Sequence, residues 1–121
     1  MKNELQDIFV VINTEFGGFS LNDEEMELWL TESGISYQVS DEKQNWSMNT
    51  SFHDEDGKFL SRYDIPRDDE VLVRLVHDNP KMFTELQIVK VPGEFRENWY
   101  IHEYDGLETV YRADYMIGEY L

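Results

Sequence analysis

Apolar positions along the chain follow two periods, one typical of strands and one typical of helices. Residues 7–14, DIFVVINT, contain five consecutive β-prone apolar residues, a run that favours a strand in the centre of a sheet. Residues 86–92, LQIVKVP, alternate two sets of side chains and end in a proline. The pattern therefore predicts one strand near the start of the chain and another in its last third.

The clearest local signal lies in residues 98–112, NWYIHEYDGLETVYR. Two alternating segments flank Asp105-Gly106, a dipeptide typical of type I′ hairpin turns. A two-residue turn fixes the register of the hairpin. The predicted facing pairs are Tyr104 and Leu107, Glu103 and Glu108, His102 and Thr109, Ile101 and Val110, and Tyr100 and Tyr111.

Residues 20–34 have the spacing of an amphipathic helix. Ser20 is the expected N-cap, and the helix is expected to run from about Leu21 to Glu32 and to stop at Gly34. Apolar side chains gather on one side of this helix and carboxylates on the other. The apolar set is Met26, Trp29 and Leu30, and the acidic set is Asp23, Glu24 and Glu27.

Residues 65–80, IPRDDEVLVRLVHDNP, predict a second helix. Asp68 is the expected N-cap, and Asn79-Pro80 is expected to end the helix. A wide apolar arc leaves only a polar stripe, formed by Glu70, Arg74 and His77. A helix of this kind should be largely buried against a sheet.

Residues 35–64 carry weaker signals. ISYQV, residues 35–39, alternates like a strand, SFHDEDGKFLSRY, residues 51–63, has the form of a hairpin turning at DEDG, and residues 40–49 are expected to be loop. Together the elements predict an α+β fold with a mixed or mostly antiparallel sheet of about five strands and two helices packed on it. A length of 121 residues suits a single globular domain over residues 1–121.

Charge is the most unusual global feature, with 26 acidic residues against 10 basic ones and a formal net charge of -16. A field of this sign repels nucleic acid and anionic membranes and attracts basic surfaces, although it also keeps a small protein soluble. An apolar content of 40% and an aromatic content of 14% predict a folded protein. The expected partner is a basic protein surface, and the candidate partner-binding residues are Asp23, Glu24, Glu25, Glu27, Asp54, Glu55, Asp56, Asp68 and Asp69.

Signals for catalysis are weak. The sequence has no cysteine, so it offers no disulfide, no thiolate nucleophile and no Cys-ligated metal. His53, His77 and His102 lie in different expected elements and lack zinc spacing. Glu103 opposite Glu108 is a possible carboxylate pair that could hold a proton or a divalent cation, or be neutralised by a nearby arginine. We therefore predict no enzymatic activity, no metal and no cofactor.

The double glycine Gly17-Gly18 follows an expected strand and precedes an expected helix, which is the order found in phosphate-binding loops. A P-loop requires a longer glycine spacing and a lysine, and the dinucleotide fingerprint requires three spaced glycines. Neither pattern is present, and no lysine or arginine occurs between Lys2 and Lys43. Acids also fill the first helical turn, where they would repel an anion. The segment is better interpreted as a tight strand-to-helix turn.

Four segments in this order, VINTEFGGFSL, IPRDDEVLV, LQIVKVP and WYIHEYDGLETV, resemble a family of small proteins encoded by tailed bacteriophages and prophages. The likeness runs from about residue 9 to 112 and covers residues 35–64 poorly. The family has Cys-Tyr before the double glycine and a proline after the acidic pair, where this chain has Glu15-Phe16 and Glu70. No catalytic residues come with the resemblance. It implies an accessory protein that acts in the bacterial cytoplasm.

These observations favour a small accessory protein that acts by non-covalent binding to a basic surface of a host protein, one that handles nucleic acid or serves in defence. Direct binding to nucleic acid or membrane is not expected, because basic patches are missing and no apolar run approaches the roughly 20 residues of a membrane span. The N-terminal MKNELQDIF lacks the pattern of a secretion signal, which favours a cytoplasmic location. Two alternatives stay open. One is an enzyme that uses paired carboxylates, and the other is a protein that sequesters a small ligand or nucleotide, for which the available cations are Arg62, Arg67, Arg74, Arg96 and Arg112.

Overall fold

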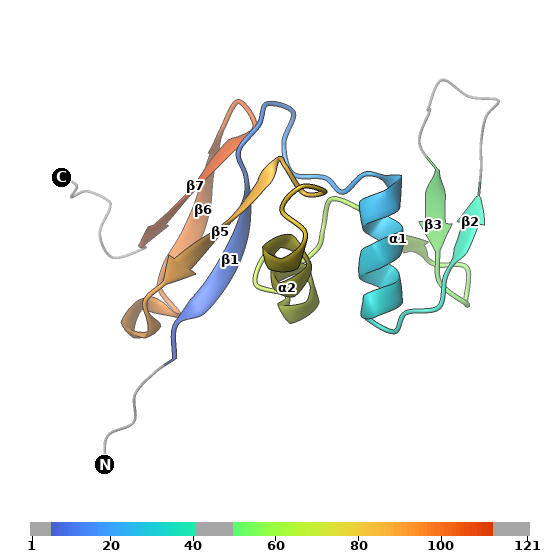
Figure 1. The fold of residues 1–121 in the computed structure, drawn as a ribbon, viewed down its shortest axis with the longest axis horizontal. Helices are drawn as coiled ribbons and strands as arrows, with labels where there is room; N and C mark the ends of the chain where they lie inside the picture. The colour runs from blue at the N-terminus through green and yellow to red at the C-terminus, as the bar shows by residue number, and fades with distance from the viewer. Residues whose placement is uncertain (1–5, 41–49, 113–121) are drawn as a thin grey trace, which may run out of the picture. The chain divides into compact units, whose positions relative to one another are not determined.

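A computed structural model describes residues 6–40 and 50–112, which contain two α-helices and seven strands (Figure 1). This content confirms the α+β class. The strands form three small antiparallel sheets, in the orders β1-β5, β2-β3-β4 and β6-β7, where the sequence predicts one sheet of about five strands. The chain divides into two compact units, Ser20–Pro66 and the combination of Met1–Phe19 with Arg67–Leu121. One domain over residues 1–121 stays a prediction.

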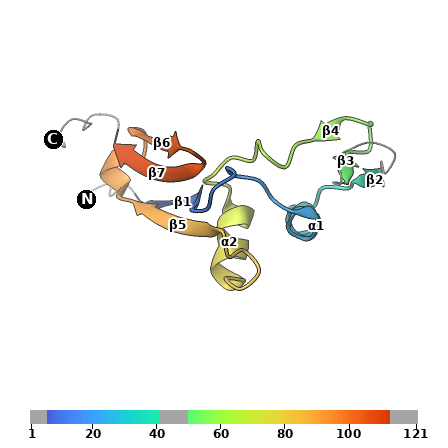
Figure 2. The same cartoon turned by 90° about the horizontal axis from the view of Figure 1, so that it is seen from above.

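The first unit, Met1–Phe19 with Arg67–Leu121, has three layers. Strand β1 (Ile8–Asn13) pairs with β5 (Leu86–Val91), and one face of this pair packs against the hairpin of β6 (Trp99–Tyr104) and β7 (Leu107–Arg112). Helix α2 (Glu70–Asp78) contacts both β1 and β5, and it lies on the side of the pair opposite the hairpin (Figure 2). The short 3-10 helix η1 (Gly93–Phe95) connects β5 to β6.

The core between the sheet layers follows from alternation along the strands. The buried side chains of Val10, Ile12 and Val91 are the centre of this cluster. Packed against them are Ile8, Val89, Phe95, Trp99, Ile101 and Val110. The hairpin therefore turns its odd-numbered β6 side chains Trp99 and Ile101 inward. All five predicted facing pairs are observed, and the same register adds a sixth, Trp99–Arg112.

Helix α2 begins one residue later than predicted. The carboxylate of Asp69, not that of Asp68, accepts a hydrogen bond from the Leu72 N–H at 2.9 Å. The helix ends at Asp78, before Asn79 and Pro80, as predicted. Leu72, Leu75 and Val76 are buried, while Glu70, Arg74 and His77 are exposed, so the predicted polar stripe is confirmed.

The second unit, Ser20–Pro66, contains helix α1 (Asp23–Glu32) and a meander of β2 (Gln38–Ser40), β3 (Ser51–His53) and β4 (Phe59–Leu60). The predicted N-cap Ser20 is wrong, because Asn22 caps α1. The Leu21 N–H donates to the Arg62 carbonyl at 3.2 Å, which holds the chain before Asn22 outside the helix. Of the predicted apolar side chains, Met26 and Leu30 are fully buried, which confirms them, whereas Trp29 is only partly buried.

The hairpin predicted in residues 51–63 is confirmed as β3 and β4. Its turn is closed by Asp54, whose N–H donates to the Lys58 carbonyl at 2.9 Å. The Asp54 carboxylate accepts hydrogen bonds from the N–H groups of Asp56 and Lys58 at 2.9 and 2.8 Å. Of the predicted loop at 40–49, Ser40 belongs to β2, and residues 41–49 lie outside the described part of the chain.

Candidate functional site

The nine predicted partner-binding acids divide into two groups. The first group is exposed to solvent and lies on α1, in the β3–β4 turn and just before α2. Its members are Glu24, Glu27, Glu55, Asp56 and Asp68. The other four carboxylates are engaged within the protein. Asp54 closes its turn, Asp69 caps α2, Asp23 forms an ion pair, and Glu25 is buried.

Glu25 was predicted to face a partner, and the structure shows that this assignment is wrong. Its side chain is only 8% exposed and accepts a hydrogen bond from the Asn22 N–H at 2.9 Å, while the Asn22 side chain accepts from the Glu25 N–H at 2.8 Å. This reciprocal capping box turns the carboxylate back onto the start of the helix. The spacing Asn22-x-x-Glu25 is visible in the sequence and could have identified both residues.

Asp23 is not freely available to a partner either, because it lies 2.8 Å from the guanidinium of Arg62. Burial alone would raise the pKa of the Asp23 carboxyl. Hydrogen bonds from Arg62 and Thr50, together with the Arg62 charge, outweigh that effect and hold this pKa below its ordinary value. The buried Arg62 also donates to the Leu21 carbonyl at 3.1 Å and lies over the Phe52 ring, so it joins α1 to β3.

The register places Glu103 opposite Glu108, as predicted, but each carboxylate has its own partner. Glu103 accepts a hydrogen bond from the Gly106 N–H at 2.7 Å. Glu108 forms a two-point ion pair with Arg67, at 2.5 and 2.8 Å, and its side chain is only 6% exposed. Arginine therefore neutralises Glu108, which was one of the outcomes that the sequence left open.

Glu108 belongs to a buried polar network that the sequence does not reveal. Its Oε1 accepts a hydrogen bond from the Asn13 N–H at 2.7 Å, and the Arg67 carbonyl accepts from the Val11 N–H at 2.8 Å. The guanidinium of Arg67 lies 3.8 Å from the centroid of the Phe19 ring. These groups occupy the edge of β1 that faces away from β5. Among the described strands β1 therefore pairs only with β5, and the expected central strand is not observed.

The network joins two turns, one at Gly17-Gly18 and one at Asp105-Gly106. The Asn13 side chain is 1% exposed and donates both to the Glu15 carbonyl, at 2.5 Å, and to the Gly106 carbonyl, at 2.7 Å. The Cα–H face of Gly106 lies directly against the other turn, since a Cβ built there would be 2.6 Å from the Gly17 nitrogen. The double glycine is thus a contact between turns. The sequence carried no signal for this contact beyond the glycines themselves.

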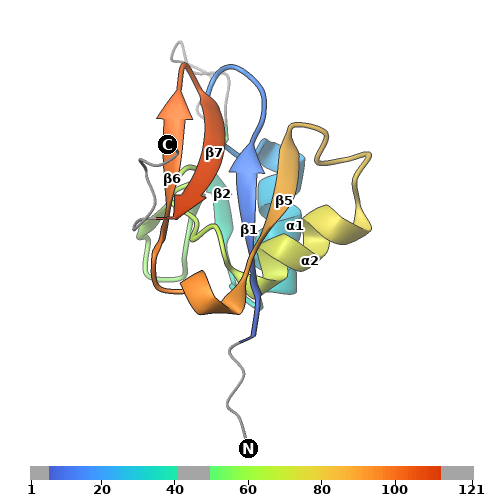
Figure 3. The ribbon, with the colours of Figure 1, turned by 90° about the vertical axis from the view of Figure 1, so that its left-hand side faces the viewer.

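The joined turns, residues 15–18 and 103–106, present aromatic and acidic side chains to solvent. Phe16 is 72% exposed and Tyr104 is 75% exposed, the highest values among the exposed large hydrophobic side chains of the described chain. Glu15, Glu103 and Asp105 are also exposed, and neither turn carries a lysine or arginine. β7 lies beside β1 along this edge (Figure 3). The surface thus combines rings with negative charge.

A groove of about 800 Å³ lies in the same unit and is lined by residues of β1, α2 and β5, among them Phe9, Val73 and Ile88. Arg74 and Arg96 line it, which bears on the small-ligand alternative. Three carboxylates line it as well, those of Asp7, Asp68 and Glu70. Because the acids outnumber the arginines, the groove is poorly suited to a phosphate.

The remaining arginines do not add to such a site. Arg62 and Arg67 are committed to ion pairs, and the side chain of Arg112 lies outside the described part of the structure. Residues 6–40 and 50–112 contain no group of three or more His, Asp or Glu side chains that could hold a metal ion. No helix in these ranges is long and apolar enough to cross a membrane. No protein-family model, curated protein or solved structure matches the chain.

Proposed function

We propose that the protein acts by non-covalent binding, through an acidic surface of its second unit, to a basic surface of another protein. The observation that carries this proposal is the charge of the described, solvent-exposed residues in Ser20–Pro66. The exposed carboxylates there are Glu24, Glu27, Glu32, Glu55, Asp56 and Asp64. Lys58 is the exposed cation of this described part, because Arg62 is buried.

Two features of α1 support its use as part of a binding surface. Glu24 and Glu27 are three residues apart, so they lie on the same side of the helix, and both are exposed. The helix itself is held in place by the buried side chains of Met26 and Leu30. The carboxylates are therefore displayed from a packed element, which reduces the entropy lost when a partner binds.

The context comes from the resemblance to small phage and prophage proteins. It favours a bacterial host factor as the partner and the bacterial cytoplasm as the location. Host proteins that bind nucleic acid display the rows of lysine and arginine to which such a surface is complementary. The surface needs no reactive group for this role, and an enzyme that uses paired carboxylates gains no support from a Glu108 that Arg67 neutralises.

The test begins with affinity purification of the tagged full chain from host and infected cells, with identification of the bound protein. Binding of that protein is then measured as a function of salt for a Glu24→Gln, Glu27→Gln, Glu55→Gln triple variant. Losing three exposed charges of about 0.3–1 kcal/mol each should weaken binding roughly fivefold to 150-fold at low salt.

A matched control removes three exposed charges from the first unit. This Glu85→Gln, Glu94→Gln, Glu97→Gln variant has the same net charge as the test variant, because all six residues are exposed acids. It should bind within about twofold of the original protein. If the two variants lose affinity equally, only net charge matters and the proposed surface is rejected.

A further inference from the structure

The β6–β7 hairpin exposes a face with unusual composition. Alternation and the observed register put Tyr100, His102 and Tyr104 of β6 and Leu107, Thr109 and Tyr111 of β7 on the side opposite the inward Trp99 and Ile101. We call these six residues the outer aromatic face. None of them carries a permanent charge, in a chain of which 30% is charged.

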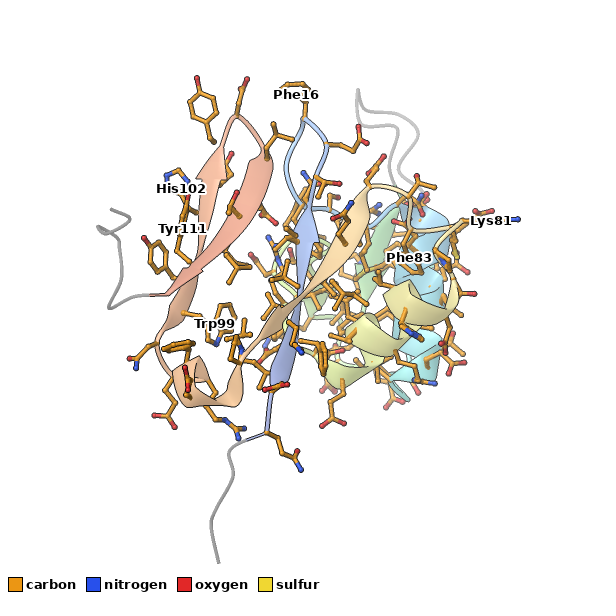
Figure 4. All side chains as sticks on the ribbon, turned by 60° about the vertical axis from the view of Figure 1, so that its left-hand side comes forward. Phe16, Lys81, Phe83, Trp99, His102 and Tyr111 are labelled. Carbon is orange, nitrogen blue, oxygen red and sulfur yellow. The ribbon has the colours of Figure 1, made fainter. Side chains whose placement is uncertain are left out.

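The rings on this face are close together. Those of Tyr100, His102 and Tyr104 are exposed to solvent, and that of Tyr111 is partly buried. The Tyr111 ring lies 5.8 Å from that of Tyr100 and 5.7 Å from that of His102, between centroids. Tyr100 is 39% exposed. Figure 4 shows His102 and Tyr111 on the side of the hairpin away from the β1–β5 pair, and Trp99 on the side toward it. An exposed patch of this kind is typical of an interaction surface.

Negative charge lies at the tip of the same hairpin. Tyr104 lies between Glu103 and Asp105 in the sequence, and the Gly106 turn lies against the turn that carries Glu15 and Phe16. The buried Asn13 fixes both turns through its two hydrogen bonds. The rings and carboxylates are therefore displayed from a supported scaffold, and the tip has no lysine or arginine to compete for them.

We infer that the outer aromatic face binds an arginine- or lysine-bearing segment of a partner protein. The faces of tyrosine rings attract cations, and the carboxylates at the tip add attraction of the same sign. The inference goes beyond the proposed function, because this face belongs to the first unit and the proposed acidic surface to the second.

Two other occupants of an aromatic face fit the charge less well. Platforms that stack single-stranded nucleic acid require a positively charged groove beside the rings, and here the tip is acidic. A second copy of this chain would bring together two molecules that each carry a formal charge of -16. A cationic peptide segment is the occupant that both the rings and the charge favour.

The test uses the full chain and a labelled peptide of four Gly-Arg repeats, with a matched peptide that has citrulline in place of each arginine. Citrulline keeps the shape of arginine and removes the charge. Binding is measured by fluorescence anisotropy at low salt, and the contacted rings are identified from tyrosine side-chain NMR shifts. The arginine peptide should bind more tightly than the citrulline peptide and should shift Tyr100, Tyr104 and Tyr111.

The decisive variant is Tyr100→Leu, Tyr104→Leu, which removes two exposed rings and keeps apolar side chains. Two cation–π contacts at exposed sites predict a loss of about fivefold to thirtyfold in affinity for the arginine peptide. The control Phe59→Leu, Tyr63→Leu removes two rings of comparable exposure from the second unit and should leave affinity within about twofold. Equal losses in both variants would overturn the inference.

Three further outcomes would also overturn it: equal binding of the two peptides, stronger binding of a single-stranded oligonucleotide, and a dimer that the tyrosine variant abolishes. The Glu24→Gln, Glu27→Gln, Glu55→Gln variant separates this inference from the proposed function. It should keep its affinity for the arginine peptide while losing affinity for the host protein. If it instead loses the peptide and the tyrosine variant keeps it, the outer aromatic face is rejected and the acidic surface of the second unit is retained.

Discussion

The contact between the two turns can be tested by replacing Gly106 with alanine. Gly106 has a φ of 89°, and an added Cβ would lie 2.6 Å from the Gly17 nitrogen and 2.8 Å from the Gly18 nitrogen. Two costs are expected. A non-glycine residue in the left-handed region costs about 1–2 kcal/mol, and the close contact forces the turns apart.

Separating the turns breaks the hydrogen bond from the Asn13 side chain to the Gly106 carbonyl, which measures 2.7 Å and is buried. Leaving a buried polar group without a partner costs about 1–3 kcal/mol. The Gly106→Ala variant should therefore lose about 2–5 kcal/mol in the free energy of unfolding. Gly18→Ala is a matched control in the same unit, because its φ is 85° and a Cβ there would contact nothing within 4 Å. It should lose only the conformational part, about 1–2 kcal/mol.

The assay is urea unfolding of both variants, followed by native-state hydrogen exchange of the β1 and β5 amides, which reports on the unit that contains both glycines. The exchange data also show whether the loss is confined to that unit. If Gly106→Ala is no less stable than Gly18→Ala, the turns do not support each other and the role assigned to the double glycine is wrong.

Three more predictions concern the buried polar groups and the helix start. Removing either partner of the buried Arg67–Glu108 pair, as Arg67→Met or Glu108→Leu, should lower the free energy of unfolding by about 3–5 kcal/mol. The double variant should lose much less than the sum of the two single losses, and additive losses in a double-mutant cycle would contradict the pairing. Asn22→Ala should cost about 1 kcal/mol by urea unfolding and Ser20→Ala close to nothing, whereas the reverse order would restore Ser20 as the cap. The folded-state pKa of Asp23 lies below the ordinary 3.8, so its stabilising contribution is present above about pH 4 and is lost as pH falls through the folded value. The stability difference between the original protein and Asp23→Asn should shrink as the pH falls over that range. The change should be modest, because the Asp23 side chain is 39% exposed. A difference that stays constant down to about pH 2 would refute the lowered pKa.

The β6–β7 hairpin could be predicted to the residue because its signals are local. Asp105 has a φ of 56° and Gly106 one of 89°, as a type I′ turn requires, and two residues of turn leave one possible pairing of the strands. The two helices could be located for a similar reason, because the helical spacing of their apolar residues is visible in the sequence. Each helix starts one or two residues later than predicted, because more than one neighbouring polar side chain could serve as its N-cap. At α1, the Leu21 N–H donates to the Arg62 carbonyl, which holds the chain before Asn22 outside the helix.

The sequence by itself determined the α+β class, the hairpin register and the abundance of exposed acid, because each depends on residue type or on spacing within a few positions. Tertiary structure decided which carboxylates a partner can reach. Arg67 and Glu108 are 41 residues apart, and Asn13 and Gly106 are 93 apart, so no local pattern could pair them. Burial makes an unpaired charge or amide costly, and the buried Glu108 and Glu25 therefore have partners within the protein. Asp23, which is partly exposed, is paired with Arg62. Tertiary structure also places Gly106 against Gly17-Gly18, and it leaves Phe16 and Tyr104 exposed to solvent.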